Sequence, residues 1–212
     1  MNLIGNKNIE TILWDFDGVI LDSMKVRDWG FEEIFKSFDE NDVSLLLEYH
    51  NKNGGLSRYV KIRYFYEEVL GKNITEEEVL NYANNFSLLM KEELINPKNL
   101  IKDSLKFIKE NYKNYKFHIV SGSDQEELRF LCKELNIDNY FISIYGSPIP
   151  KNKLVKDLLK AHNYDVEKTC LIGDSMNDFE AASINNIKFY GFNNLELLNG
   201  DNEYIHSFSS IN

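Results

Sequence analysis

Two acidic residues with a single residue between them interrupt an apolar stretch of the chain. Asp15 and Asp17 lie within the run Ile12-Leu13-Trp14-Asp15-Phe16-Asp17-Gly18-Val19-Ile20. Side chains alternate between faces in an extended chain, so both carboxylates point the same way. Two carboxylates this close need a cation between them or a shared proton. The pair predicts a divalent-metal site with one carboxylate as nucleophile and the other as general acid/base, although aspartates also cap helices and start turns.

Polar groups also follow the other apolar runs of the chain. Because open parallel sheets bind ligands beyond the carboxyl ends of their strands, we expect these groups to converge. They comprise four acidic groups, a hydroxyl, a backbone N–H and an ammonium, from Asp15, Asp17, Ser121, Gly122, Lys151, Asp174 and Asp178. Hard oxygen ligands suit Mg²⁺, and the remaining donors suit phosphoryl oxygens.

The elements that must position these residues follow a βα rhythm, which predicts an α/β fold with a Rossmann-like doubly wound parallel sheet. The expected strands are 9–16, 117–120, 141–145, 169–172 and 188–192, and the expected helices are 152–162, 178–184 and one that ends near 135. Asp124 and Glu127 have capping-box spacing at the start of the last of these. We therefore assign Asp124 to that helix N-terminus and not to catalysis.

Residues 22–96 differ, because they contain amphipathic helical patterns and no convincing strand. The expected helices are 29–38, 42–49, 57–70 and one capped by Thr75 with Glu78 that runs toward Leu94. Asp22 and Ser23 follow the first acidic pair and could begin the hinge of the lid or cap a helix, of which the cap is preferred. The predicted organisation is an α/β core of residues 1–21 and 97–212 with an all-helical lid, 22–96, inserted after the first strand.

Composition limits the class of protein. The 212 residues are 43% hydrophobic and 27% charged, which predicts a globular chain. The net charge of −10 argues against a nucleic-acid partner. The start of the chain lacks the apolar stretch of a signal peptide and no segment is long enough to span a bilayer, so we expect a cytoplasmic protein without a membrane partner. Cys132 and Cys170 are expected to be buried thiols.

Four motifs in order give the chain a family resemblance. They are Asp15-Phe16-Asp17-Gly18-Val19, Ser121, Lys151 and Gly173-Asp174-Ser175-Met176-Asn177-Asp178. The chain thereby resembles phosphohydrolases of the haloacid dehalogenase (HAD) superfamily, in the phosphoglycolate phosphatase-like and β-phosphoglucomutase-like group with a helical cap of the first type. The resemblance implies a HAD-like core with the lid as the cap.

The resemblance also implies roles for these residues. Asp15 would become an aspartyl phosphate, and Asp17 would protonate the leaving oxygen and then deprotonate a water. The aspartate at position 17 favours phosphoryl transfer, because the dehalogenases of this superfamily lack it. Other implied roles are Mg²⁺ binding by Asp15, the Asp17 carbonyl and Asp174, support of the metal or of Lys151 by Asp178, and phosphate binding by Ser121, Gly122 and Lys151.

Two assignments stay open in the sequence. Lys151 is preferred to Lys153 as the phosphate-binding lysine because it lies nearer the Gly146-Ser147-Pro148 turn. Within the lid, Gly55 and Arg58 belong to a glycine-containing loop that could close over the site and select the substrate. The alternative for Arg58 is an exposed helix residue.

The predicted function is hydrolysis of a small phosphorylated metabolite, such as a sugar phosphate or a phosphoglycolate-like acid, by a Mg²⁺-dependent phosphatase. A phosphomutase of the same fold is the nearest alternative. A non-enzymatic phosphoreceiver or a scaffold protein is more distant. The sequence leaves open whether the protein is a monomer or a dimer.

Overall fold

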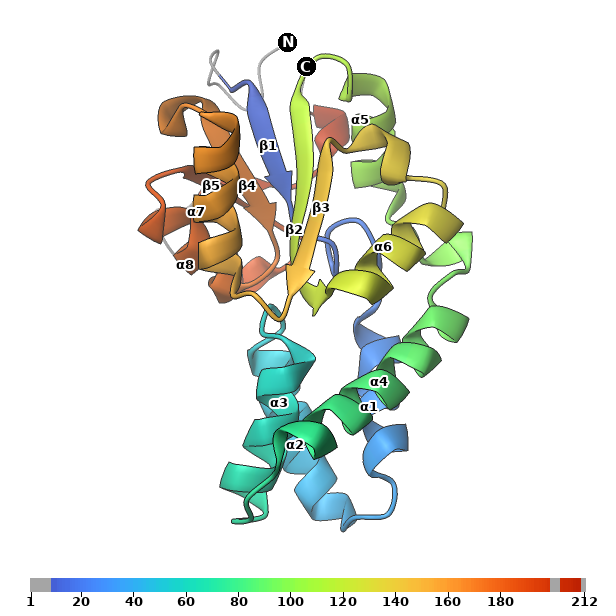
Figure 1. The fold of residues 1–212 in the computed structure, drawn as a ribbon. Coiled ribbons are helices and arrows are strands. Elements are labelled where there is room, and N and C mark those ends of the chain that lie inside the picture. Colours follow the sequence, from blue (N-terminus) through green and yellow to red (C-terminus); the bar gives the residue numbers. More distant parts are fainter. Residues whose placement is uncertain (1–8, 199–202, 211–212) are drawn as a thin grey trace.

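A parallel sheet of six strands organises the computed structural model, which describes residues 9–198 and 203–210 (Figure 1). The strand order is β3-β2-β1-β4-β5-β6, and every paired strand is parallel. This order confirms the doubly wound α/β prediction. The strands are β1 (Thr11–Trp14), β2 (Lys116–Asp124), β3 (Ser143–Ser147), β4 (Thr169–Gly173), β5 (Lys188–Phe192) and β6 (Glu203–Ile205).

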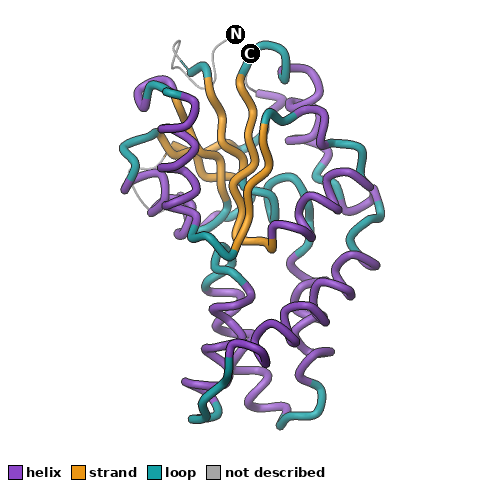
Figure 2. The backbone as a smooth tube through the Cα atoms, in the orientation of Figure 1, coloured by secondary structure: helices purple, strands orange, loops and turns teal. Residues whose placement is uncertain are grey.

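Helices cover both faces of the sheet (Figure 2). Ile12 and Trp14 pack on the face covered by α5 (Lys102–Asn111) and α6 (Gln125–Glu134). Leu13 points to the opposite face, which α7 (Lys151–His162) and α8 (Met176–Ile184) cover. Apolar side chains are therefore buried on both faces of the central strand, which explains its continuous hydrophobic run. Both cysteines are free and buried, as predicted.

Strands β2 and β3 differ from the expected strands. β2 continues to Asp124 with an irregular register after Val120, so Ser121 lies inside the strand. β3 begins two residues later than predicted, because a 3-10 helix at Asp138–Tyr140 precedes it. Both strands also end further along the chain than predicted, at the edge of the sheet where the polar groups gather.

The helices of residues 22–96 lie together beyond the carboxyl ends of the strands (Figures 1 and 2). We call these residues the insertion. Its helices are α1 (Met24–Phe35), α2 (Glu40–Lys52), α3 (Arg58–Tyr64), the π-helix η1 (Phe65–Val69) and α4 (Glu76–Glu93). Among the residues described, no helix is long and apolar enough to cross a membrane.

The first insertion helix starts earlier and ends sooner than predicted. Its bounds follow a buried stripe at four-residue spacing, formed by Arg27, Phe31 and Phe35. Because the first of these residues is charged, the sequence did not reveal the stripe as apolar. Ser23 does occupy the N-cap position of α1, but its side chain makes no capping hydrogen bond. Thr75 and Glu78 do form the predicted capping box of α4.

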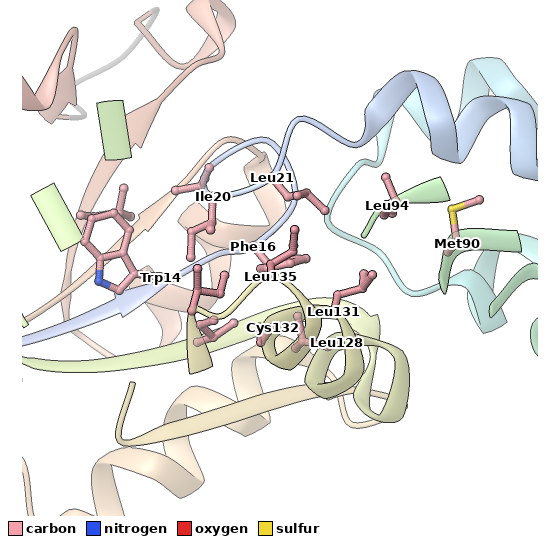
Figure 3. Close-up of a cluster of buried hydrophobic side chains, with 14 of the residues drawn as sticks. Trp14, Phe16, Ile20, Leu21, Met90, Leu94, Leu128, Leu131, Cys132 and Leu135 are labelled. Carbon is pink, nitrogen blue, oxygen red and sulfur yellow. The ribbon is translucent and has the colours of Figure 1, made fainter. Parts of the chain in front are cut away.

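A continuous apolar cluster joins the insertion to the core (Figure 3). Met90 of α4 and Leu94 just after it lie beside Leu128 and Leu131 of α6, and all four side chains are fully buried. Burying each such side chain contributes about 1.5–3 kcal/mol. One side of the insertion is therefore anchored by hydrophobic packing.

Candidate active site

Two loops at the strand ends approach each other closely around Gly18. The chain turns at Asp15, whose backbone N–H donates to the carbonyl of Ile172 on β4 (2.9 Å). Gly18 has φ +73°, and a Cβ there would lie 1.9 Å from Oδ2 of Asp174. Only glycine therefore allows this turn and this approach.

Two asparagines after β5 also hold these loops, and sequence reasoning missed them. Asn193 Nδ2 donates to the carbonyl of Gly18 (2.9 Å), and Asn194 Nδ2 donates to the carbonyl of Asp174 (2.8 Å). Their signal in the sequence is an Asn-Asn pair at the end of a strand, where turn-forming residues are common.

The structure brings three of the predicted carboxylates together, and we call them the acidic cluster: Asp15, Asp174 and Asp178. One oxygen from each lies within 4.8 Å of the others. The buried Lys151 Nζ donates to Asp15 Oδ1 (2.7 Å) and to Asp178 Oδ1. Lys153 instead pairs with Asp157 on the exposed side of α7, so Lys151 is the lysine at the site.

Charge in the acidic cluster is incompletely compensated. Burial, followed by the charge of Asp178, raises the pKa of Asp15 to about 7 although Lys151 opposes the shift. Burial, then the charges of Asp15 and Asp178, also raise the pKa of Asp174 well above its usual value. Three carboxylates facing one ammonium are a donor set that fits a hard divalent cation.

Asp178 already uses both carboxylate oxygens. Oδ1 accepts from Lys151, and Oδ2 accepts from the backbone N–H (3.1 Å) and the hydroxyl (2.6 Å) of Ser175. The same contacts form a capping box that starts α8. The residue thus ties the lysine to the loop after β4.

The Asp17 carboxylate turns away from the acidic cluster. Its Oδ1 accepts from Arg27 Nε (2.8 Å) and from the hydroxyl of Ser23, and its Oδ2 accepts from the Ser123 hydroxyl (2.5 Å). Burial would raise the pKa of Asp17, but the Arg27 charge and these hydrogen bonds outweigh it and lower the pKa. Ser23 thus binds this carboxylate in place of capping α1.

Glycines allow a loop of the insertion to contact the core. A Cβ on Gly122 would lie 2.2 Å from the carbonyl oxygen of Gly55, and a Cβ on Gly55 would lie 2.5 Å from Ser175 Oγ. Asn177 Nδ2 also donates to the Gly55 carbonyl (2.9 Å). The loop before α3 therefore closes directly over the ends of β2 and β4.

Between the insertion and the core lies a small cavity of about 30 Å³. Its lining includes the predicted residues Asp15, Asp17, Ser121, Gly122, Asp174, Gly55 and Arg58. The buried Ser121 hydroxyl accepts from the Ser123 backbone N–H (3.1 Å). Both units of the molecule therefore contribute side chains to one shared pocket.

Arg58 is buried, which overturns the alternative of an exposed helix residue. Its Nη1 donates to Glu127 Oε2 (2.6 Å) and to Ser87 Oγ (2.7 Å), and the guanidinium lies 4.7 Å from the ring centre of Phe86. The other oxygen of Glu127 accepts from Arg27 Nη1 (3.1 Å).

The capping-box prediction is therefore correct for Asp124 and wrong for Glu127. Asp124 does accept from the backbone N–H groups of Glu126 and Glu127 (both 3.1 Å). The Glu127 carboxylate is fully buried between two arginines of the insertion, because a salt bridge there satisfies it better than an N-terminal N–H. Its position three residues after Asp124 concealed this function in the sequence.

A buried lysine on α3 completes the wall of the cavity. Lys61 Nζ hydrogen-bonds to His50 Nδ1 (2.6 Å) and to the carbonyl of Gly54 (3.1 Å). Burial, with the charges of Arg27 and Arg58, lowers the pKa of Lys61 to about 7. Burial and the Lys61 charge lower the pKa of His50 to about 2, so this imidazole is neutral.

Comparisons with known proteins agree with the motifs. The chain matches the haloacid dehalogenase-like hydrolase family over residues 12–192. It is similar to a β-phosphoglucomutase from Clostridium difficile (TM-score 0.76, 19% identity, 96% of this chain and 93% of that chain covered). It is also similar to a HAD-hydrolase from Bacillus subtilis described as bound to magnesium (TM-score 0.71, 14% identity, 96% of each chain).

A third similar structure is a predicted phosphoglycolate phosphatase from Haemophilus somnus (TM-score 0.69, 15% identity, 95% of each chain). No curated protein matches the sequence. At these identities, the likeness to solved structures shows a shared fold. The family match spans most of the sequence, and the protein belongs to the haloacid dehalogenase-like hydrolases.

Proposed function

We propose that the protein is a Mg²⁺-dependent phosphatase that hydrolyses a small phosphate ester and carries the phosphoryl group on Asp15 between two steps. The observation that carries this proposal is the separation of two carboxylates only two residues apart. Asp15 lies among Lys151 and two further carboxylates, whereas Asp17 lies in a different hydrogen-bonding network. Such a division suits a nucleophile beside a general acid/base.

The acidic cluster supplies the metal site. Asp15, Asp174 and the backbone carbonyl of Asp17 would hold Mg²⁺, which when bound supplies positive charge to the phosphoryl oxygens. Asp178 instead positions Lys151, since both of its oxygens are already hydrogen-bonded.

In the first step, a carboxylate oxygen of Asp15 attacks phosphorus, and the bond from phosphorus to the ester oxygen breaks. Asp17 gives a proton to that leaving oxygen. In the second step, Asp17 takes a proton from a water that attacks the aspartyl phosphate, which releases inorganic phosphate and restores Asp15. Arg27 favours the ionised Asp17 that the second step needs, and the negative charge of a nearby phosphoryl group favours the protonated form for the first.

The remaining phosphoryl oxygens need hydrogen-bond donors. The Ser121 hydroxyl and the Gly122 N–H lie beside Asp15 in the cavity lining, and Lys151 reaches Asp15 directly. Donors fixed in advance stabilise the charge that develops in the transition state.

A phosphomutase would use the same residues and return the phosphoryl group to a sugar. The match to a hydrolase family favours the phosphatase. Release of inorganic phosphate without an isomerised product, and no dependence on a bisphosphate activator, would distinguish the two reactions.

The decisive experiment is Asp15→Asn, which keeps the shape of the side chain and removes its charge. Turnover of an aryl phosphate with Mg²⁺ should fall by roughly a thousandfold or more. Circular dichroism should show an unchanged fold, and Lys153→Gln on the exposed side of α7 is the matched control. Activity retained in Asp15→Asn would refute the proposal.

A further inference from the structure

Three cationic side chains of the insertion face the cavity with hydrogen-bonding capacity to spare. We call Arg27, Arg58 and Lys61 the basic cluster. Nη2 of Arg27 and Nη2 of Arg58 are buried and have no hydrogen-bond partner among the described residues. Lys61 Nζ has three protons to donate and makes two hydrogen bonds. All three side chains line the cavity that also contains Asp15.

The basic cluster carries more positive charge than its protein partners neutralise. Asp17 pairs with Arg27, and Glu127 pairs with both arginines. With Lys61 protonated, three cations face these two directly paired carboxylates, which leaves one positive charge. Asp28 does not reach Lys61, because the His50 ring lies between them with Nδ1 on the lysine and Nε2 3.6 Å from Asp28.

The unused hydrogen-bonding groups of the basic cluster determine which chemical class of ligand fits it. A sugar hydroxyl both donates and accepts hydrogen bonds, whereas the unused groups of Arg27, Arg58 and Lys61 are donors alone. A carboxylate is an acceptor alone, carries one negative charge and suits a guanidinium geometrically. The remaining charge therefore corresponds to a carboxylate more closely than to a second phosphate group.

We propose that the basic cluster binds a carboxylate of the substrate, so that the substrate is a short phosphorylated carboxylic acid of two or three carbons. This inference rests on the proposed phosphatase function. Because Asp15 and Asp174 of the acidic cluster line the same cavity as the basic cluster, the phosphate and the carboxylate must be close together in the substrate. Glu127 is a positioning residue that holds both guanidinium groups at the wall of the cavity.

The test compares two esters of equal chain length, 2-phosphoglycolate and 2-hydroxyethyl phosphate. Wild-type kcat/KM should be roughly 10- to 100-fold higher for the acid, the range expected for hydrogen bonds to a charged group. A ratio near one with both esters turned over would overturn the inference without any variant. Higher kcat/KM for hexose phosphates or bisphosphates would also overturn it.

Variants then locate the preference. Lys61→Met and Arg58→Lys should bring the ratio toward one, mainly through a higher KM for the acid. Glu127→Gln should lower the ratio as well, although it cannot contact the substrate. Arg63→Gln is the matched control, because Arg63 lies on α3 but pairs with Glu76 outside the cavity and should leave the ratio unchanged.

The outcomes separate this inference from the proposed function. An unchanged ratio in both Lys61→Met and Arg58→Lys would overturn the carboxylate site while the phosphatase function stands. Absence of turnover for every phosphate ester with wild-type protein would overturn the phosphatase function, and this inference with it.

Discussion

The two walls of the cavity carry opposite excess charge: Asp15 and Asp174 of the acidic cluster line one wall, and the basic cluster lines the other. The acidic cluster places three carboxylates against Lys151, whereas the basic cluster places three cations against Asp17 and Glu127. The first wall needs positive charge and the second needs negative charge. A divalent cation at the acidic cluster and an anionic group at the basic cluster would each offset excess charge of the opposite sign.

The two contacts between insertion and core also differ in kind. Along α4 and α6 the contact is apolar and continuous, within the buried cluster that contains Met90, Leu94, Leu128 and Leu131 (Figure 3). At the loop before α3, the backbone carbonyl of Gly55 lies so close to Gly122 that Gly122 has no room for a side chain. The apolar contact supplies stability, and the glycine contact sets how closely the insertion covers the site.

The largest expected effect comes from removing the cation that the acidic wall needs. A chelator should reduce phosphatase activity by more than a thousandfold, and added Mg²⁺ should restore it. Mg²⁺ should also raise Tm, by more at pH 8 than at pH 5.5, because Asp15 with a pKa of about 7 binds a proton at the lower pH in competition with the metal.

Thermal unfolding with and without Mg²⁺ at both pH values checks this prediction. In Asp174→Asn the metal-dependent rise in Tm should largely disappear. A rise in Tm that is equal at both pH values would argue against metal binding by the acidic cluster.

The next largest effect is expected at Glu127, whose carboxylate neutralises part of the positive charge of the basic wall. Glu127→Ala leaves the buried Arg58 without a carboxylate partner and Arg27 with Asp17 alone, so it should lower the free energy of unfolding by about 3–5 kcal/mol. Chemical denaturation measures the loss. Glu76→Ala is the control, because its pair with Arg63 is exposed and should contribute less than about 1 kcal/mol. Equal losses in the two variants would contradict the structural difference.

A smaller effect is expected at the glycine contact. The Cβ of Gly122→Ala would lie 2.2 Å from the Gly55 carbonyl, so the insertion cannot approach the core as closely. We expect kcat/KM to fall roughly 10- to 100-fold, since small misplacements at a site cost this much. Gly54→Ala is the matched control, because its Cβ would meet no atom closer than 3.9 Å. Comparable losses in the two variants would show that closure does not depend on this contact.

The smallest effect concerns the charge of Lys61. Its pKa of about 7 in the fold lies below the ordinary value of 10.5, so the buried ammonium destabilises the folded state most fully below pH 7. Lys61→Met should therefore stabilise the metal-free protein by roughly 1–2 kcal/mol at pH 6.5, with a gain that shrinks toward pH 10. Urea denaturation at several pH values measures it, and a gain independent of pH would contradict a charged, uncompensated Lys61.

Some of the site followed from the sequence because the necessary signals are local. Asp15, Ser121, Lys151 and Asp174 each lie at the end of an apolar run or close to one. A parallel sheet brings such positions to one edge, so their convergence required only the fold class. The capping box of Thr75 and Glu78 was predictable for the same reason, since its partners are three residues apart.

Other features had no local signal. Glu127 satisfies the spacing of a capping box, yet its carboxylate pairs with Arg27 and Arg58, which lie 100 and 69 positions earlier in the chain. Ser23 has a cap-forming side chain but donates to Asp17 instead. In both cases a buried charge formed a stronger hydrogen bond than a helix N-terminus offers, and tertiary contacts determine which charges are buried.

The sequence by itself therefore determined the α/β sheet, the helical insertion and the residues of the acidic wall, because periodicity and strand-end position are properties of short segments. Only the tertiary structure decided that Arg27, Arg58 and Lys61 form the opposite wall and that Glu127 holds the arginines. Those decisions depend on how the insertion packs over the strand ends, where burial turns ordinary charged residues into groups that must find partners.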